Sequence, residues 1–228
     1  MESVILLYMT DPSTISAADC LGIIEEALPS RLQQSLLRAV FEDYRAAYDS
    51  SYTEYDPQQA RDINGHLRRA NIERDLLGIG KRFKDLQVKA EFYKNGTGSY
   101  VRLMSGAVIL TQSAVQSPDS PVRSAEFRKS LAGNPQLSLN FGGLEAAEDD
   151  VPGQYLYVIL LHGKDVKDRS RPAFVQLVVP SADCSMFVAR VDLYKKFPEI
   201  VNAYVPSAET ASPEIQLVAR KNNQKKQA

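Results

Sequence analysis

A row of basic side chains beginning at residue 61 is the part of this sequence best suited to contact with phosphate groups. Lys and Arg side chains neutralise phosphates and release their counterions, so such binding would be sensitive to salt. The spacing of Arg61, Arg68 and Lys81 predicts that they share the solvent face of one helix. The alternative is a solvated face with helical ion pairs, because acids are interleaved with the bases. The candidate contacts for nucleic acid or an acidic partner are Arg61, Arg68, Arg69, Lys81 and Arg82.

Tyrosines form a second row just before the basic one. Tyr44, Tyr48, Tyr52 and Tyr55 follow one another at intervals of 4, 4 and 3 residues. If the helix that carries them continues past Asp49, they form one stripe. Tyrosine joins an apolar ring to a polar tip and is a common interface anchor, and the acidic neighbours here favour a protein partner over nucleic acid. The alternative is that Tyr44 and Tyr48 pack in the core while the other two cover a loop.

Histidine, cysteine and glycine patterns offer few further sites. His162 with Asp165 or Asp168 could form an acid–base pair, because histidine exchanges protons near neutral pH. The alternative makes His162 a strand-end residue and the polar segment after it a mobile hairpin loop. In that loop, bases alternate with acids, a pattern suited to reversible contact with a partner. No nucleophile-elbow or phosphate-loop motif is present in a suitable context, and we expect no metal and no cofactor.

Charge is sorted into blocks along the chain, although the net charge is only −1. Residues 1–60 carry ten acids and three bases, whereas residues 61–131 carry thirteen bases and seven acids. Such asymmetry bears on partners rather than on fold. The two cysteines, Cys20 and Cys184, are far apart, and we expect buried thiols in a reducing compartment. The apolar run near the start is too short for a signal sequence, which predicts a cytoplasmic protein.

Helical periodicity dominates residues 14–83. Ser16 with Asp19 resembles a capping box, and Ser30 with Gln33 predicts a second box that opens a helix running to about Asp49. Asp56 followed by Pro57 predicts the start of a third helix, since Asp is a good N-cap and Pro suits the first helical position. Gly65 interrupts this helical pattern and could mark close packing.

From residue 86 the apolar period changes to two. Three closely linked strands at 86–92, 100–103 and 108–110 predict an antiparallel meander. Two strongly apolar strands follow at 155–161 and 174–179, and residues 186–191 either continue the sheet or begin a helix. A first strand at 3–9 could join the sheet at an edge. Residues 142–153 read as an acidic loop and 220–228 as a disordered basic tail.

These elements predict an α+β fold in which an N-terminal helical layer packs on a mainly antiparallel sheet. The helical layer comprises residues 14–83, and the sheet comprises residues 85–111 and 154–191. Because the apolar helix faces need the sheet for burial, we expect a single domain over residues 1–219.

The order of elements from Pro57 to Leu161 resembles the core of the restriction-type metal-dependent nucleases. That family uses two acids and a lysine, divided between the second and third core strands, and its metal activates water. The corresponding strands here, SYVRLM and AVILTQ, contain no acid. The nearest set is Glu73, Glu91 and Lys89, and the resemblance therefore implies a divergent nuclease only as the alternative function.

The preferred function is an intracellular, non-enzymatic interaction or regulatory protein. Its acidic, tyrosine-rich helical layer would bind a protein partner, which could be an identical chain. Its basic central face would contact nucleic acid or an acidic surface. A small toxin–antitoxin or phage-defence component would suit such a chain, and we expect no contact with a membrane.

Overall fold

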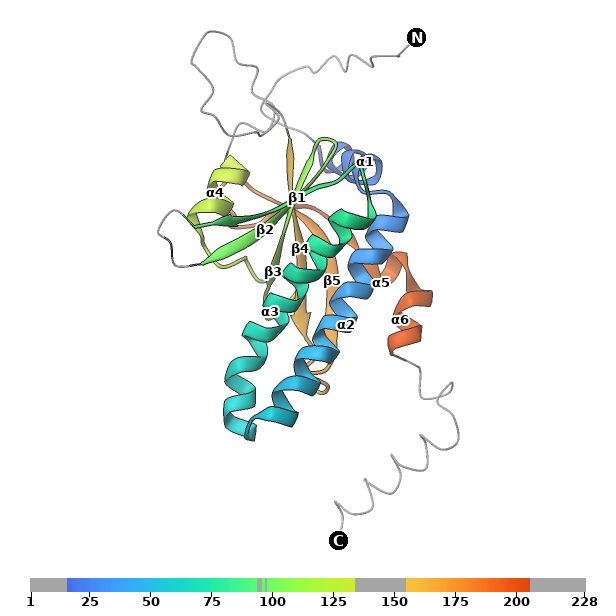
Figure 1. Ribbon diagram of the computed structural model, residues 1–228. Coiled ribbons are helices and arrows are strands. Elements are labelled where there is room, and N and C mark those ends of the chain that lie inside the picture. Colours follow the sequence, from blue (N-terminus) through green and yellow to red (C-terminus); the bar gives the residue numbers. More distant parts are fainter. Residues whose placement is uncertain (1–15, 94–95, 97, 134–154, 206–228) are drawn as a thin grey trace.

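A computed structural model describes residues 16–93, 96, 98–133 and 155–205 (Figure 1). The helices are α1 (Ala17–Ala27), α2 (Ser30–Glu54), α3 (Pro57–Arg82), α4 (Glu126–Gly133), α5 (Leu193–Lys196) and α6 (Pro198–Tyr204). The strands are β1 (Gln87–Phe92), β2 (Ser99–Ser105), β3 (Val108–Ala114), β4 (Leu156–Lys164), β5 (Pro172–Pro180) and β6 (Phe187–Asp192). In the described part of the chain, no helix is both long and apolar enough to cross a membrane.

The strands form one sheet in the order β1-β2-β3-β4-β5-β6. Neighbouring strands are antiparallel except for β3 and β4, which run parallel with Leu110 opposite Val158. A parallel pair needs a crossover, and the chain between these strands includes α4. The predicted α+β class, with a helical layer on a mainly antiparallel sheet, is confirmed.

The two faces of the sheet carry different layers. Helices α1, α2, α3, α5 and α6 share one apolar core with one face, which includes Leu110, Leu160 and Leu177. The opposite face, which includes Tyr157 and Ile159, packs against α4. Burial of these apolar side chains on both faces is the main stabilising contribution to the fold. We call the first the helix face and the second the α4 face.

Helices begin at all three predicted places, and two of the three predicted caps are confirmed. Ser16 and Asp19 form a reciprocal capping box at α1, and Asp56 accepts the N–H groups of Gln58 and Gln59 at α3. The predicted box of Ser30 and Gln33 is wrong. Pro29 occupies the N-cap of α2, and the Gln33 amide instead donates to the carbonyl of Leu28 at 2.6 Å.

Other differences follow from packing between elements. Helix α2 continues five residues past the predicted end at Asp49, because its last turns pack against the start of α3. The close packing suggested for Gly65 is absent there and occurs at Gly80, where an added Cβ would lie 2.8 Å from the Cβ of Val88. Residues 187–192 continue the sheet as β6, and helices α5 and α6 follow. The predictions for 3–9, 142–153 and 220–228 lie outside the described residues.

Candidate interaction surface

The far ends of α2 and α3 extend past the sheet as a helical hairpin (Figure 1). Small and polar residues lie between the two helices at this end, where Ala47 and Ala60 are fully buried. The amide of Asn64 also donates to the hydroxyl of Ser51 at 3.0 Å. This hydrogen bond satisfies two polar groups that would otherwise be costly to bury. The hairpin is therefore held together internally, without support from the sheet.

The predicted tyrosine row divides between the core and the extended end. Tyr44 is fully buried against the sheet, whereas Tyr48 and Tyr52 are half-buried and their ring centroids lie 4.5 Å apart. Tyr55, at the C-cap of α2, is 39% exposed. Because α2 continues to Glu54, the last three tyrosines lie on its final turns. With the acids Asp49, Glu54 and Asp56 they form a surface that we call the tyrosine end: Tyr48, Tyr52, Tyr55, Asp49, Glu54 and Asp56.

A chain of hydrogen bonds starts at Tyr44 and fastens α2 and α3 to the sheet. The Tyr44 hydroxyl lies 2.8 Å from Nδ1 of His162, and Nε2 of His162 lies 3.1 Å from Oε1 of Gln112. The Gln112 amide donates to Glu73 at 3.3 Å, and Glu73 accepts a 2.9 Å bond from Arg69. We call these five side chains the buried polar chain. It links β3 and β4 to both long helices.

The carboxylate of Glu73 fixes the direction of the hydrogen bonds in the buried polar chain. A carboxylate only accepts hydrogen bonds, so Gln112 turns its NH₂ group toward Glu73 and its oxygen toward His162. His162 therefore carries its proton on Nε2, and its Nδ1 accepts from the Tyr44 hydroxyl. Burial, together with the positive charge of Arg68, lowers the pKa of His162 to about 3. The imidazole is neutral at physiological pH and acts here as a structural link.

The predicted acid–base pairs of His162 are not formed. Its ring hydrogen-bonds to Tyr44 and Gln112, while Asp165 and Asp168 are bound to Arg171 in the following loop. Gln112 gave no recognisable signal in the sequence, because it lies in an apolar strand where alternation alone does not reveal a polar partner.

The candidate basic residues do not form one continuous face. Arg68 lies over the ring of Tyr44 at 4.7 Å, and Arg69 binds Glu73, the Tyr93 hydroxyl and the Ser99 carbonyl. Successive helical residues are about 100° apart, so the step from Arg68 to Lys81 leaves Lys81 about 220° around α3. The prediction that these two share a face with Arg61 is wrong for Lys81. Four of the five candidates are exposed, and Arg69 is the one of these that is held by the contacts just described. The other three exposed candidates lie toward the two ends of α3: Arg61, Lys81 and Arg82.

An ion pair between α2 and α3 joins the acidic block to the basic block. Arg74 Nη2 lies 3.4 Å from Oδ1 of Asp43, whose side chain is almost fully buried. Burial and the negative charge of Asp75 raise the pKa of Asp43 to about 7, against the opposing effect of Arg74. Because Arg74 is largely exposed, solvent screens its attraction for this carboxylate. The Asp43 site is therefore costly for a negative charge.

The structure does not bring Glu73, Glu91 and Lys89 together as a nuclease site. Glu73 lies on α3 and accepts a hydrogen bond from Gln112 on the helix face of the sheet. Glu91, in contrast, binds Arg102 at 2.6 Å and the Tyr100 hydroxyl on the α4 face. Lys89 lies opposite Arg102 in the adjacent strand. Among the described residues, no group of three or more His, Cys, Asp or Glu side chains could hold a metal ion.

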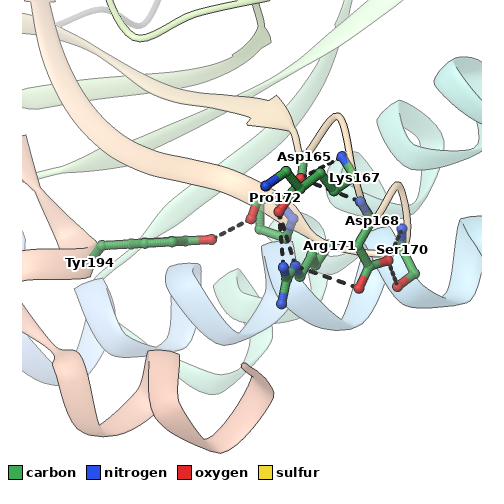
Figure 2. Close-up of polar contacts among 7 residues, drawn as sticks. All are labelled: Asp165, Lys167, Asp168, Ser170, Arg171, Pro172 and Tyr194. Atoms are coloured by element: carbon green, nitrogen blue, oxygen red, sulfur yellow. Dashed lines mark hydrogen bonds and ion pairs between the residues drawn. The ribbon is translucent and has the colours of Figure 1, made fainter. Parts of the chain in front are cut away.

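The polar segment between β4 and β5 forms an ordered set of hydrogen bonds (Figure 2). Asp165 Oδ1 accepts the N–H groups of Lys167 and Asp168, and its Oδ2 binds Nε and Nη2 of Arg171 at 3.1 Å. Asp168 accepts the N–H and hydroxyl of Ser170 and lies 3.5 Å from Arg171 Nε. Both acids therefore stabilise the loop from within.

Cys20 and Cys184 are buried free thiols, as predicted. Burial, followed by the nearby charge of Asp19, raises the pKa of Cys20, so the thiol rather than the thiolate is favoured. Burial also raises the pKa of Cys184. Neither cysteine is suited to nucleophilic chemistry, which requires a thiolate.

Comparison with protein-family models, curated proteins and solved structures finds no match to this chain.

Proposed function

We propose that this chain is a non-enzymatic interaction protein that binds a protein partner through the tyrosine end. The observation that carries the proposal is the position of Tyr48, Tyr52 and Tyr55. They lie on the final turns and C-cap of α2 and are exposed or half-buried. This end of α2 extends past the sheet (Figure 1). Tyrosines in such a position offer large apolar contact area at low entropic cost, and each hydroxyl can find a polar partner.

The charges around these rings favour a protein over a nucleic acid. Asp49, Glu54 and Asp56 surround the tyrosines and would repel a phosphate backbone. The pair of Asp49 with Arg45 has a 3.9 Å separation, and both side chains are mostly exposed. Such a pair contributes little, so Asp49 stays available to a partner.

The enzymatic alternative has less support from the geometry. A metal-dependent nuclease needs its acids around one ion, and Glu73 and Glu91 lie on opposite faces of the sheet with arginine partners of their own. His162 is enclosed between Tyr44 and Gln112 and is fully buried. A buried polar chain of this kind serves to orient the helices that carry the tyrosine end.

Co-purification with matched variants tests the proposal. Two differently tagged copies are expressed together, and the proteins recovered with one tag are quantified by mass spectrometry. The double variant Tyr52→Ser, Tyr55→Ser should lower recovery of the partner by about tenfold or more, as loss of interface anchors does. The control is Phe92→Ser, which removes an aromatic side chain that is 80% exposed at the end of β1.

Equal recovery with the wild-type chain and the tyrosine double variant would contradict the proposal. Thermal melts of both variants must match the wild type, so that a loss of binding is not a loss of folding.

A further inference from the structure

The loop between β4 and β5 keeps its negative charges on the inside. Asp165 and Asp168 are bound by Arg171 and by backbone N–H groups (Figure 2). The hydroxyl of Tyr194 also donates to the carbonyl of Pro172 at 2.6 Å and holds the exit of the loop. These contacts predefine the shape of the loop, which lowers the entropy that a partner would have to remove.

The outer side of this loop is positive with an apolar tip. Lys164 and Lys167 are exposed, Arg169 is partly exposed, and Val166 is 87% exposed. Among the described residues, no ion pair joins these three cations to an acid. We call this surface the basic hairpin: Lys164, Val166, Lys167 and Arg169.

The basic hairpin and the tyrosine end lie at the same end of the molecule. His162, two residues before the end of β4, contacts Tyr44 of α2. From Tyr44, α2 continues in the direction of Tyr48 and Tyr52, which follow one and two turns later, at about 5 Å per turn. The loop lies beside α2 in Figure 2, and β5 packs against the same helix. The two surfaces are therefore neighbours.

The two surfaces are complementary in charge and in chemistry. One offers lysine and arginine with an exposed valine, and the other offers carboxylates with tyrosine rings. Cations bind the faces of aromatic rings as well as carboxylates, so both kinds of contact are possible between them. Within one chain, no ion pair among the described residues connects the basic hairpin to Asp49, Glu54 or Asp56. A second copy of the chain would supply what each surface lacks.

We propose that two copies of this chain associate about a two-fold axis at this end, with the basic hairpin of each on the tyrosine end of the other. The proposal rests on the proposed function and specifies its partner as an identical chain. A two-fold contact uses each complementary pair twice, so a modest interaction is doubled in the dimer. The contact would also place cations against the exposed acids of α2, of which Asp49 has only a long, exposed pair with Arg45.

Sedimentation velocity of the full chain tests this inference, from low to high micromolar concentration in low and high salt. The wild type should change with concentration from a 25.3 kDa species to one of twice that mass, and salt should weaken the association. Reversing the hairpin charges with Lys164→Glu and Lys167→Glu should raise the dissociation constant about tenfold or more. Reversing the other surface with Asp49→Lys and Glu54→Lys should do the same.

The combined variant with both reversals should recover association to within about threefold of the wild type, because the opposite charges again face one another. The matched control is Lys84→Glu with Lys129→Glu, which reverses two exposed lysines outside both surfaces and should leave the dissociation constant unchanged. Circular dichroism melts check that each variant is folded.

A wild-type chain that stays monomeric at every concentration would overturn the inference, as would a dimer that is insensitive to both reversals. The chain could be monomeric in sedimentation and still co-purify with a different protein in a way that requires Tyr52 and Tyr55. That result would overturn the dimer and leave the proposed function standing. The proposed function fails on a different result, namely that the Tyr52→Ser, Tyr55→Ser variant co-purifies with the same proteins, in the same amounts, as the wild type.

Discussion

Acidification should destabilise the fold through His162. The imidazole is neutral and fully buried, and burial with the charge of Arg68 lowers its pKa from 6.5 to about 3. The unfolded chain therefore binds this proton more strongly than the folded one. The stability linked to His162 is complete above pH 6.5 and is lost as the pH falls toward 3. One pKa unit corresponds to about 1.4 kcal/mol, so the step from pH 7 to pH 5 should remove about 2 kcal/mol.

Urea unfolding at pH 7, 6 and 5 measures this loss when the wild type is compared with His162→Gln. Asp43 titrates with the opposite sign, because its raised pKa stabilises the folded state as the pH falls. Both proteins contain Asp43, so the difference between them isolates His162. The advantage of the wild type should shrink by about 2 kcal/mol between pH 7 and pH 5. His66→Gln, at an exposed position on α3, is the control.

Parallel pH profiles for the wild type and His162→Gln, with a change in their difference below about 0.5 kcal/mol, would refute this reasoning. That result would mean that His162 exchanges protons with water in the folded state and is not enclosed by Tyr44 and Gln112.

Three further predictions concern buried charge, close packing and loop order. Asp43→Asn should stabilise the chain relative to the wild type, because the asparagine carries no charge to bury. In urea unfolding, this gain in the free energy of unfolding should grow by about 2 kcal/mol from pH 5 to pH 8. A variant less stable than the wild type at pH 8 would show that the ion pair with Arg74 dominates. Gly80→Ala should lower the free energy of unfolding by about 1–3 kcal/mol through its clash with β1. Gly65→Ala, in the same helix, should raise it by up to about 1 kcal/mol, because an added Cβ there meets only the Arg68 side chain, at 3.8 Å. Thermal melts that shift in the same direction for both variants would contradict this contrast. Arg171→Met should speed amide hydrogen exchange at 167, 168 and 170 by about tenfold without a matching loss of global stability, and unchanged exchange rates would show that Arg171 does not order the loop.

The elements of this fold were largely predictable from local pattern. The helical periodicity before residue 83 and the period of two after it follow from which side chains face the core. The caps at Ser16 and Asp56 involve only residues two or three positions away, so both partners of each hydrogen bond are visible in a short stretch of sequence. The box predicted at Ser30 fails because Gln33 is drawn to the Leu28 carbonyl, and this choice depends on burial at the α1–α2 corner.

The candidate site was less predictable because its contacts are long-range. His162 meets Tyr44 across 118 residues of sequence, and no local pattern indicates that partner. Arg68 and Arg69 look like free cations in the sequence, yet Tyr44 and Glu73 engage them in the structure. The tyrosine row was visible as a spacing. The sequence did not show that Tyr44 lies in the core and the other three tyrosines at the extended end of α2, because this depends on where α2 ends relative to the sheet.

Photo-crosslinking in cells tests the binding role of the tyrosine end most directly. A photoreactive phenylalanine analogue replaces Tyr52 in one protein and exposed Lys84, near the start of β1, in another. The proposed function predicts a covalent adduct with a second protein chain from position 52 and none from position 84. The absence of an adduct from position 52, or equal yields from both positions, would contradict it.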